Sequence, residues 1–321
     1  MKYKYNPNLK IIKPEWKGNP VFKSRFSNSN VPDEKFNPFD ILKWKFSKNP
    51  QAEEKKNDSF KLKVIKNSSF INSEEDMILW LGHASFFIQI NGISLITDPI
   101  FLAPPFFKRL SELPCKPEDL KNIDYLLISH FHPDHFNKKS IHILTKNNSE
   151  IEALITLEGG KYFEKRNIKY QEAGWYQQYK TDNIEVYFLP AKHWHKRSLN
   201  DTNKILWGSF LIKSGSKSIY FSGDTAYANH FNEIKTLFGK IDYCIMPVGA
   251  YKPDYIMNNS HISPKKSLQA YTELSGKVFI PMHYGTFDLS DEPPGEPIRI
   301  LEKEKANYNI QILDVGQILN I

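Results

Sequence analysis

The chain has 321 residues, 40% of them hydrophobic, so it can bury a sizeable core and is not disordered as a whole. Its two cysteines, Cys115 and Cys244, exclude a cysteine-rich metal site, and we expect both thiols to be unpaired in a reducing compartment. No stretch approaches the roughly 20 apolar residues that span a bilayer, and the N-terminus lacks the apolar core of a secretory signal. A soluble cytoplasmic protein is therefore expected.

Residues 1–75 are predicted to be a basic extension that wraps a main domain spanning residues 76–321. Residues 1–70 contain 16 Lys and Arg against 7 Asp and Glu, in a chain whose net charge is +7. The extension is either simply solvated or attracts phosphate, anionic lipid or nucleic acid. It shows no sustained hydrophobic period and is predicted to be mostly irregular, with a short helix over residues 39–46. Its aromatic side chains are expected to pack on the main domain or on a partner: Trp16, Phe22, Phe26, Phe36, Phe39 and Trp44.

From residue 76 onward, short apolar runs of strand length alternate with Gly, Asp and Pro. Helices are predicted over residues 135–148 and 264–274, the second opened by Ser263 as N-cap and Pro264 at its first position. Many strands interleaved with a few helices predict an α/β or α+β sandwich. The predicted strands lie within residues 77–83, 85–90, 93–99, 124–130, 153–157, 184–191, 207–213, 218–224, 243–249, 277–283 and 311–315.

The strongest chemical signal is the segment HFHPDH at residues 130–135, directly after a predicted strand. Because strand side chains alternate, His130 and His132 point to the same side, and the following turn can bring Asp134 and His135 into the same pocket. Imidazole and carboxylate ligands without thiolate suit zinc, iron or manganese in an open catalytic site. Four ligands cannot fill two metal spheres, so further ligands are expected at other strand ends. The candidates are His193, Asp224 and His283.

These motifs resemble the metallo-β-lactamase superfamily, and most closely the phospholipases D that hydrolyse N-acyl-phosphatidylethanolamine and their bacterial relatives. The resemblance runs from Trp80 to about Pro297. The matching segments are WLGHAS, LITDPIF, LISHFHPDH, PAKHW, LWGSF, FSGDTAY, PVGAYKP and MHYGTF. It implies an αββα sandwich of two mixed β-sheets flanked by helices, holding two Zn²⁺ ions, with Fe or Mn as alternatives. The implied ligands are His130, His132 and His193 for one ion and Asp134, His135 and His283 for the other, with Asp224 as the bridge.

The implied activity is hydrolysis of an N-acyl-phosphatidylethanolamine-like phosphodiester by a hydroxide shared between the two cations. Asp134 and Asp224 are the catalytic carboxylates of this scheme, and His261, which matches a family histidine, would bind or protonate the leaving oxygen. A lactone or other ester of a small soluble metabolite is the alternative substrate. A non-enzymatic protein that binds membrane or nucleic acid through the basic extension is the third hypothesis, although no nucleic-acid module is apparent. Relatives dimerise, so a homodimer is also expected.

Other polar residues are candidates for supporting roles. Asp98 is expected to accept the free ring N–H of a ligand histidine, or else to form a turn before proline. His83 is expected either near the site or in a hydrogen bond of the core. Lys192 and Arg197, with Lys196 between them, either pair with a substrate phosphate or are solvated.

Aromatic residues near the expected substrate entrance have two interpretations. Phe101, Phe106 and Phe107 form either a slot for an acyl chain or part of the core. Residues 104–113 are shorter than in the family's animal members. The remaining histidines lack a strand-end context and are expected to be exposed: His142, His195 and His230.

Overall fold

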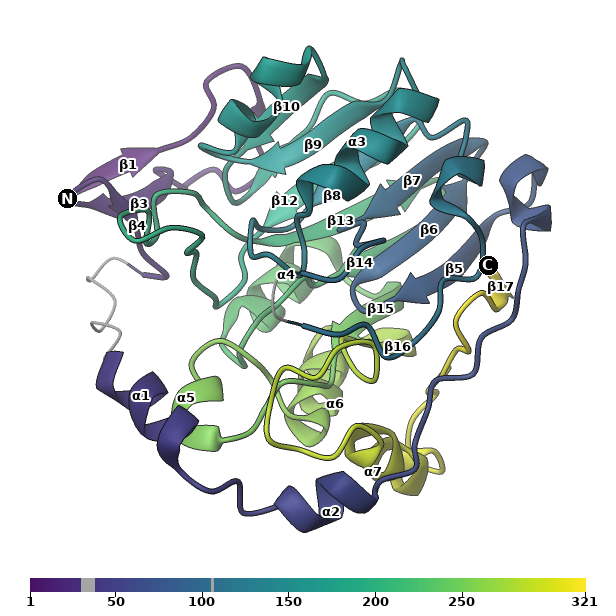
Figure 1. The fold of residues 1–321 in the computed structure, drawn as a ribbon. Helices are drawn as coiled ribbons and strands as arrows, with labels where there is room; N and C mark the ends of the chain where they lie inside the picture. Colours follow the sequence, from purple (N-terminus) through teal and green to yellow (C-terminus); the bar gives the residue numbers. More distant parts are fainter. Residues whose placement is uncertain (30–37, 105–106) are drawn as a thin grey trace.

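Two seven-stranded mixed sheets face each other in the computed structural model, which describes residues 1–29, 38–104 and 107–321 (Figure 1). The first sheet contains, in spatial order, β10 (Lys169–Ala173), β9 (Glu152–Thr156), β8 (Tyr125–Ile128), β7 (Ile93–Thr97), β6 (Ser85–Ile90), β5 (Met77–Gly82) and β17 (Ile318–Asn320). The second contains β16 (Gly276–Met282), β15 (Ile241–Pro247), β14 (Lys217–Phe221), β13 (Ser209–Ser214), β12 (Glu185–Leu189), β11 (Gln177–Gln178) and β2 (Lys10–Ile11). Each sheet is parallel at one end of this order and antiparallel at the other.

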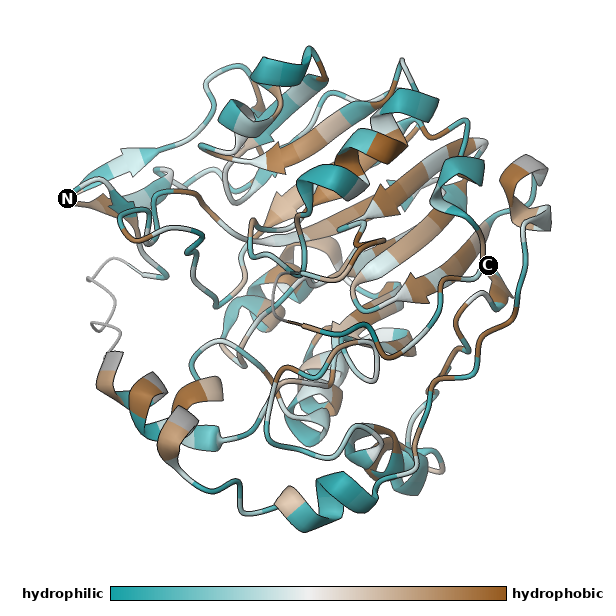
Figure 2. Ribbon diagram, in the orientation of Figure 1, coloured by the Kyte–Doolittle hydropathy of each residue, from teal (hydrophilic) through white to brown (hydrophobic). Residues whose placement is uncertain are grey.

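Both faces of the inner strands of the first sheet are buried, which is why β5 and β8 are continuously apolar. In β5, Ile78 and Trp80 point into the core between the sheets, whereas Leu79 and Leu81 point to the outer face. The helix α3 (Lys138–Asn147) covers that outer face, with its apolar side inward (Figure 2). The predicted sandwich of two mixed sheets flanked by helices is confirmed.

The outer face of the second sheet is covered by helices from the C-terminal half. These are α4 (His230–Phe238) and α6 (Pro264–Glu273), against which α7 (Glu296–Glu304) packs. The short helix α5 (Asp254–Met257) lies beside α1 (Pro38–Phe46) (Figure 1).

The N-terminal extension is more regular than its sequence indicates. It contains a three-stranded sheet of β1 (Lys2–Lys4), β3 (Asn19–Phe22) and β4 (Arg25–Phe26), and β2 pairs with β11 at the edge of the second large sheet. These strands have two to four residues, too few to show a hydrophobic period. The helix predicted over residues 39–46 is confirmed as α1, whereas α2 (Ala52–Asn57) was not predicted.

Most aromatic residues of the extension pack as expected. Phe26 is buried in the core, Trp16 packs against the ring of Tyr176 at 4.9 Å, and Trp44 donates a hydrogen bond from Nε1 to Asp291. Phe39 is 73% exposed. Phe22 is half-buried, and Phe36 lies outside the described residues.

The strand predicted over residues 311–315 is wrong. Ile310 and Val315 each form an isolated bridge, to Phe279 and Val64, and the chain between them is irregular. Its apolar pattern reflects burial along the edge of β16 rather than a hydrogen-bonded ladder, since Leu313 is 3% exposed. Every other predicted strand run contains a strand of the structure, and both predicted helices are present as α3 and α6.

Cys115 and Cys244 are free thiols, as predicted. No helix among the described residues is both long enough and apolar enough to cross a bilayer.

Candidate metal centre

Four parallel-running strands from both sheets end at one edge of the sandwich, which brings their C-terminal loops together. After β8 the chain continues as an irregular segment through HFHPDH, and after β12 it continues as an irregular segment to His193. Loops at strand ends can point polar groups into a common space without breaking the ladders. The chemically functional residues that follow β8, β12, β14 and β16 are His130, His193, Asp224 and His283.

Three histidines form the first group of the cluster. Nδ1 of His132 lies 3.1 Å from Nε2 of His130 and 3.1 Å from Nε2 of His193. Behind these rings, Nδ1 of His130 lies 3.0 Å from Ser129 Oγ, and Nδ1 of His193 lies 2.8 Å from the carbonyl oxygen of Ser260. That carbonyl can only accept, so His193 carries its proton on Nδ1 and directs a bare Nε2 toward His132.

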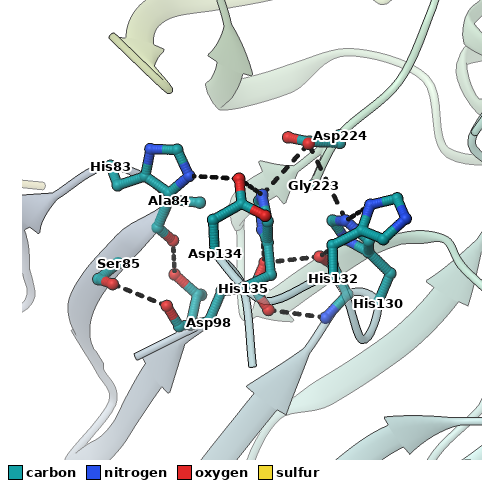
Figure 3. A network of polar contacts seen from close by, with 12 residues as sticks. His83, Ala84, Ser85, Asp98, His130, His132, Asp134, His135, Gly223 and Asp224 are labelled. Carbon is teal, nitrogen blue, oxygen red and sulfur yellow. Dashed lines mark hydrogen bonds and ion pairs between the residues drawn. The ribbon is translucent and has the colours of Figure 1, made fainter. Parts of the chain in front are cut away.

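The second group is built around two carboxylates (Figure 3). Oδ2 of Asp134 lies 3.6 Å from Nε2 of both His135 and His283. Asp224 lies between the two groups, because its oxygens are 3.2 Å from the same two Nε2 atoms and 3.9 and 4.0 Å from Nε2 of His130 and His193. The structure therefore brings together all seven side chains that the sequence proposes as ligands.

Burial and charge divide these histidines into two classes. Burial lowers the pKa of His132 to about 3 and that of His130 and His193 well below the usual value, so these rings are neutral. Burial also lowers the pKa of His283, but the Asp224 and Asp134 carboxylates together outweigh it and the pKa rises to about 9. The same balance raises the pKa of His135.

Asp98 sits behind the second group, as the sequence predicts, and is completely buried. Its Oδ2 lies 2.8 Å from Nδ1 of His135 and accepts a hydrogen bond of 2.5 Å from Ser129 Oγ (Figure 3). Because Ser129 gives its proton to Asp98, it accepts one from Nδ1 of His130. Asp98 therefore fixes the tautomer of His135 directly and that of His130 through Ser129.

His83 also lies against the centre rather than elsewhere in the core. Its Nε2 is 3.1 Å from Oδ2 of Asp134 (Figure 3). Its ring centroid is 4.0 Å from that of His283. Its backbone has φ of +55°, and that of His283 has φ of +65°. Thr286 Oγ1 accepts a hydrogen bond from the backbone N–H of His83, which helps to hold this strained turn.

The three cationic residues near His193 differ in position. Lys192 and Lys196 line the cleft above the centre. Arg197 turns inward, and its Nη1 donates to the carbonyl oxygens of Phe131 and Phe136, at 2.7 and 2.9 Å. The guanidinium thus holds the HFHPDH loop in place, a role that the sequence did not predict, and pairing of Arg197 with a substrate phosphate stays a prediction.

Two of the three histidines expected to be exposed are buried. His195 is 0% exposed, with its ring stacked 6.1 Å from that of His132, and His230 is 7% exposed against the ring of Phe231. His195 comes shortly after His193 and His230 shortly after Asp224, and a pattern of strand ends does not show that the chain is buried at these two positions. His142 is exposed on α3, as expected.

The cluster opens into a cleft of about 1870 Å³, whose floor includes His132, Asp134, His193 and His261. Nδ1 of His261 lies 3.8 Å from Oδ2 of Asp224, and burial lowers its pKa to about 4. The walls come from the N-terminal extension, α1, α5 and the loop after His193. They carry more cations than acids; the cations are Lys2, Lys4, Lys23, Arg25, Lys192 and Lys196.

The aromatic residues near residue 104 lie in different environments. Phe101 belongs to the core, and Phe107 lines the cleft with 41% of its surface exposed. Phe106 lies outside the described residues. Phe101 is buried on the other side of the sheet, so it does not line an acyl slot together with Phe107.

The first group fits a metal ion by its own chemistry. His130 and His193 are neutral with bare Nε2 atoms, and both face the single Nδ1 of His132, which can carry only one proton. At least one of the two contacts therefore opposes two lone pairs unless a cation lies between them. Nitrogen ligands of one tetrahedral zinc ion lie about 3.4 Å apart, close to the observed spacing.

This fold, with a cluster of histidines and carboxylates at the strand ends, defines a protein of the metallo-β-lactamase type with a candidate metal site. The chain belongs to the beta-lactamase superfamily, because the model of the beta-lactamase superfamily domain matches residues 94–284, more than half of its length.

Three similar proteins illustrate the range of the comparison. The mitochondrial N-acyl-phosphatidylethanolamine-hydrolyzing phospholipase D of Saccharomyces cerevisiae is 34% identical over 241 residues, which cover 70% of this chain and 50% of that protein. A UPF0173 metal-dependent hydrolase of Caldivirga maquilingensis is 28% identical, with 75% of this chain and 96% of that protein covered. The crystal structure of a diiron beta-hydroxylase from Streptomyces venezuelae has a TM-score of 0.58 at 17% identity, covering 78% of this chain and 55% of that one, and shares the fold. The chain spans about half to two thirds of the length of the first phospholipase D relatives it matches.

Sequence reasoning missed two residues that contact His193. Ser260 supplies the carbonyl that holds its Nδ1, and Asn28 of the N-terminal extension contacts its backbone. Neither contact has a local signal, because Ser260 acts through its backbone and Asn28 lies 165 residues away in sequence.

Proposed function

We propose that this protein is a metal-dependent hydrolase of phosphodiesters, of the phospholipase D type, acting on N-acyl-phosphatidylethanolamine-like phospholipids. The observation that carries the proposal is the convergence of seven imidazole and carboxylate groups on the floor of a cation-rich cleft. Relatives named as phospholipases D and as metal-dependent hydrolases support it.

In this proposal His130, His132 and His193 hold one divalent cation and Asp134, His135 and His283 hold the other, with Asp224 between them. Zinc suits this nitrogen- and oxygen-rich set, and iron or manganese are alternatives. When bound, two such cations polarise a phosphoryl oxygen and lower the pKa of water toward about 7.

The protein's own groups orient the reaction. Asp98 and the Ser260 carbonyl fix the rings of His135 and His193, and His83 holds Asp134. His261 faces the cleft beside Asp224 and is neutral at pH 7, so it donates a hydrogen bond to a substrate oxygen rather than a proton. Lys192 and Lys196 offer positive charge to the phosphate.

The cleft favours a lipid over the small soluble ester that is the alternative substrate. Its walls combine the cations with apolar side chains, among them Trp44, Phe107, Tyr255 and Met257. We also propose that the rim of this cleft meets an anionic membrane surface. On α1, Phe39, Leu42 and Phe46 are exposed and share one helical face, and the same helix contains the cleft-lining Trp44.

Replacing Asp224 with Ala tests the proposed chemistry. We expect hydrolysis of N-acyl-phosphatidylethanolamine to be abolished and the metal content of the purified protein to fall, because the carboxylate between the two groups is lost. A lactone panel assayed in parallel, with and without chelator, tests the alternative substrate. Retained activity in D224A, or turnover of lactones alone, contradicts the proposal.

A further inference from the structure

The N-terminal extension reaches the candidate metal centre through the residues after β4. The backbone N–H of Phe26 donates to the carbonyl of Asn203 at 2.7 Å, and the Phe26 side chain is buried in the core. These contacts anchor residues 26–28 beside the loop that contains His193.

Asn28 then binds the backbone of His193 on both sides. Its Nδ2 donates to the His193 carbonyl at 2.9 Å, and its Oδ1 accepts from the His193 N–H at 3.2 Å. Oδ1 also accepts from Trp207 Nε1 at 3.2 Å, which holds the amide plane. A primary amide presents one donor edge and one acceptor edge, as a peptide group does, so Asn28 takes the place of a neighbouring strand.

The loop needs such partners because the strand β12 has already ended at Leu189. Lys192 still bridges to Ala226, whereas the chain from His193 onward is irregular. Two residues later the backbone N–H of His195 donates to Asn203 Oδ1 at 3.0 Å, and the His195 carbonyl accepts from the backbone N–H of Asn203 at 2.8 Å. Buried backbone groups in an irregular segment need side-chain partners, and asparagines provide them here.

The ring of His193 is held separately from its backbone. Nδ1 lies 2.8 Å from the Ser260 carbonyl, and Nε2 lies 3.1 Å from Nδ1 of His132. The direction of Nε2 is therefore fixed by two constraints, one on the ring from residue 260 and one on the main chain from residue 28. Loss of the second leaves the ring free to tilt about the first.

We infer that Asn28 is a positioning residue for the metal centre and that the N-terminal extension thereby completes the site. The inference rests on the proposed function, in which His193 is a metal ligand. It assigns to the extension a role at the centre itself, besides any contact with lipid.

Zn²⁺ affinity of the full-length chain, measured by chelator competition, tests this role together with the absorption spectrum of the Co²⁺-loaded protein. We expect N28A and N28D to weaken the binding of one of two ions about 10- to 100-fold and to change the Co²⁺ spectrum. Asp has the size of Asn but places an acceptor against the His193 carbonyl, so N28D keeps the test available if N28A does not fold.

N6A is the matched control. Asn6 lies in the same extension and donates from Nδ2 to the Glu172 carbonyl at 2.7 Å, on the side of β10. We expect N6A to lower the thermal unfolding temperature and to leave Zn²⁺ affinity within twofold of wild type. A loss of affinity in N6A as large as that in N28A would overturn the inference, because it would show a general effect of the extension.

H193A separates the inference from the proposed function. If H193A binds both Zn²⁺ ions as wild type does, the ligand assignment itself is wrong. If H193A loses an ion while N28A and N28D stay within twofold of wild type, the ligand assignment stands and the role of Asn28 is wrong.

Discussion

Gly223, immediately before Asp224, is held in a left-handed conformation that favours glycine, at a place with no room for a Cβ. Its φ is +56°, and an added Cβ would lie 2.7 Å from Ser129 Cβ and 2.9 Å from the Gly208 carbonyl oxygen. Ser129 in turn bonds Asp98, so a displacement here reaches the ligand histidines.

G223A is therefore expected to lower the free energy of unfolding by more than the ~1–2 kcal/mol that a left-handed alanine costs, and to reduce metal content. G215A is the control, since Gly215 has φ of +55° with open space around its Cα. Urea unfolding and metal analysis of both variants compare strain alone with strain plus displacement. Equal losses in the two variants would contradict the steric argument.

His230 makes a pH-dependent contribution to stability. Burial lowers its pKa to about 3, below the ~6.5 of an unfolded histidine, so the unfolded chain binds the extra proton first. Stability from this residue is complete above pH 6.5 and is lost as the pH falls toward 3, by ~2 kcal/mol at pH 5. The free energy of unfolding in urea should fall between pH 7.5 and pH 5 by ~2 kcal/mol less for H230Q than for wild type. An equal fall in the two proteins would show that His230 does not titrate in this way.

At the scale of elements, the HFHPDH loop is held in its shape by the guanidinium of Arg197. Arg197 is half-buried, and burial lowers its pKa, while its guanidinium caps two carbonyls of the loop. Lys196, its neighbour, lines the cleft instead.

These positions predict different effects for substitution of the two residues. R197A is expected to lower the unfolding temperature and the Zn²⁺ affinity, because two carbonyls lose their donor. K196A is expected to raise KM for an anionic substrate several-fold with little change in stability, because it removes surface charge only. Steady-state kinetics and thermal unfolding of both variants make the comparison, and a pure KM effect in R197A would support the phosphate-binding interpretation.

At the scale of the whole molecule, the apolar and basic features of the surface share one side of the protein. Phe39 and Phe46 are 73% and 83% exposed on α1, which lies beside α5 (Figure 1). Lys43 of α1 lies over the ring of Tyr255. Exposed apolar patches of this kind mark contact surfaces for other proteins or for membranes.

We expect F39A/F46A to weaken binding to vesicles of phosphatidylcholine and phosphatidylserine, measured by sedimentation, about tenfold or more. Two rings that become buried in the lipid contribute several kcal/mol to binding. Hydrolysis of a short-chain soluble phosphodiester should stay at the wild-type level, because α1 does not carry the metal ligands. The control is L199A, at a 90% exposed site in the loop after His193. Equal vesicle binding by wild type and F39A/F46A would exclude α1 as the contact surface.

Local pattern determines much of this fold. Apolar runs of strand length predict the strands because a strand buried on both faces is apolar at every position, as in β5 and β8. The segment 130–135 concentrates four ligand-type residues in six positions, so its chemistry is legible without coordinates. Similarly, Ser263 and Pro264 mark the start of α6.

Only the tertiary structure decides how the remaining residues act. His195 is buried and Arg197 turns inward because the loop that contains them folds back on the centre, and His230 is buried where α4 begins. These placements depend on contacts far away in the chain. The basic, irregular-looking extension supplies a strand to the second sheet and Asn28 to the backbone of His193. Sequence periodicity reports local burial, whereas a hydrogen bond across 165 residues depends on where the complete fold places both partners.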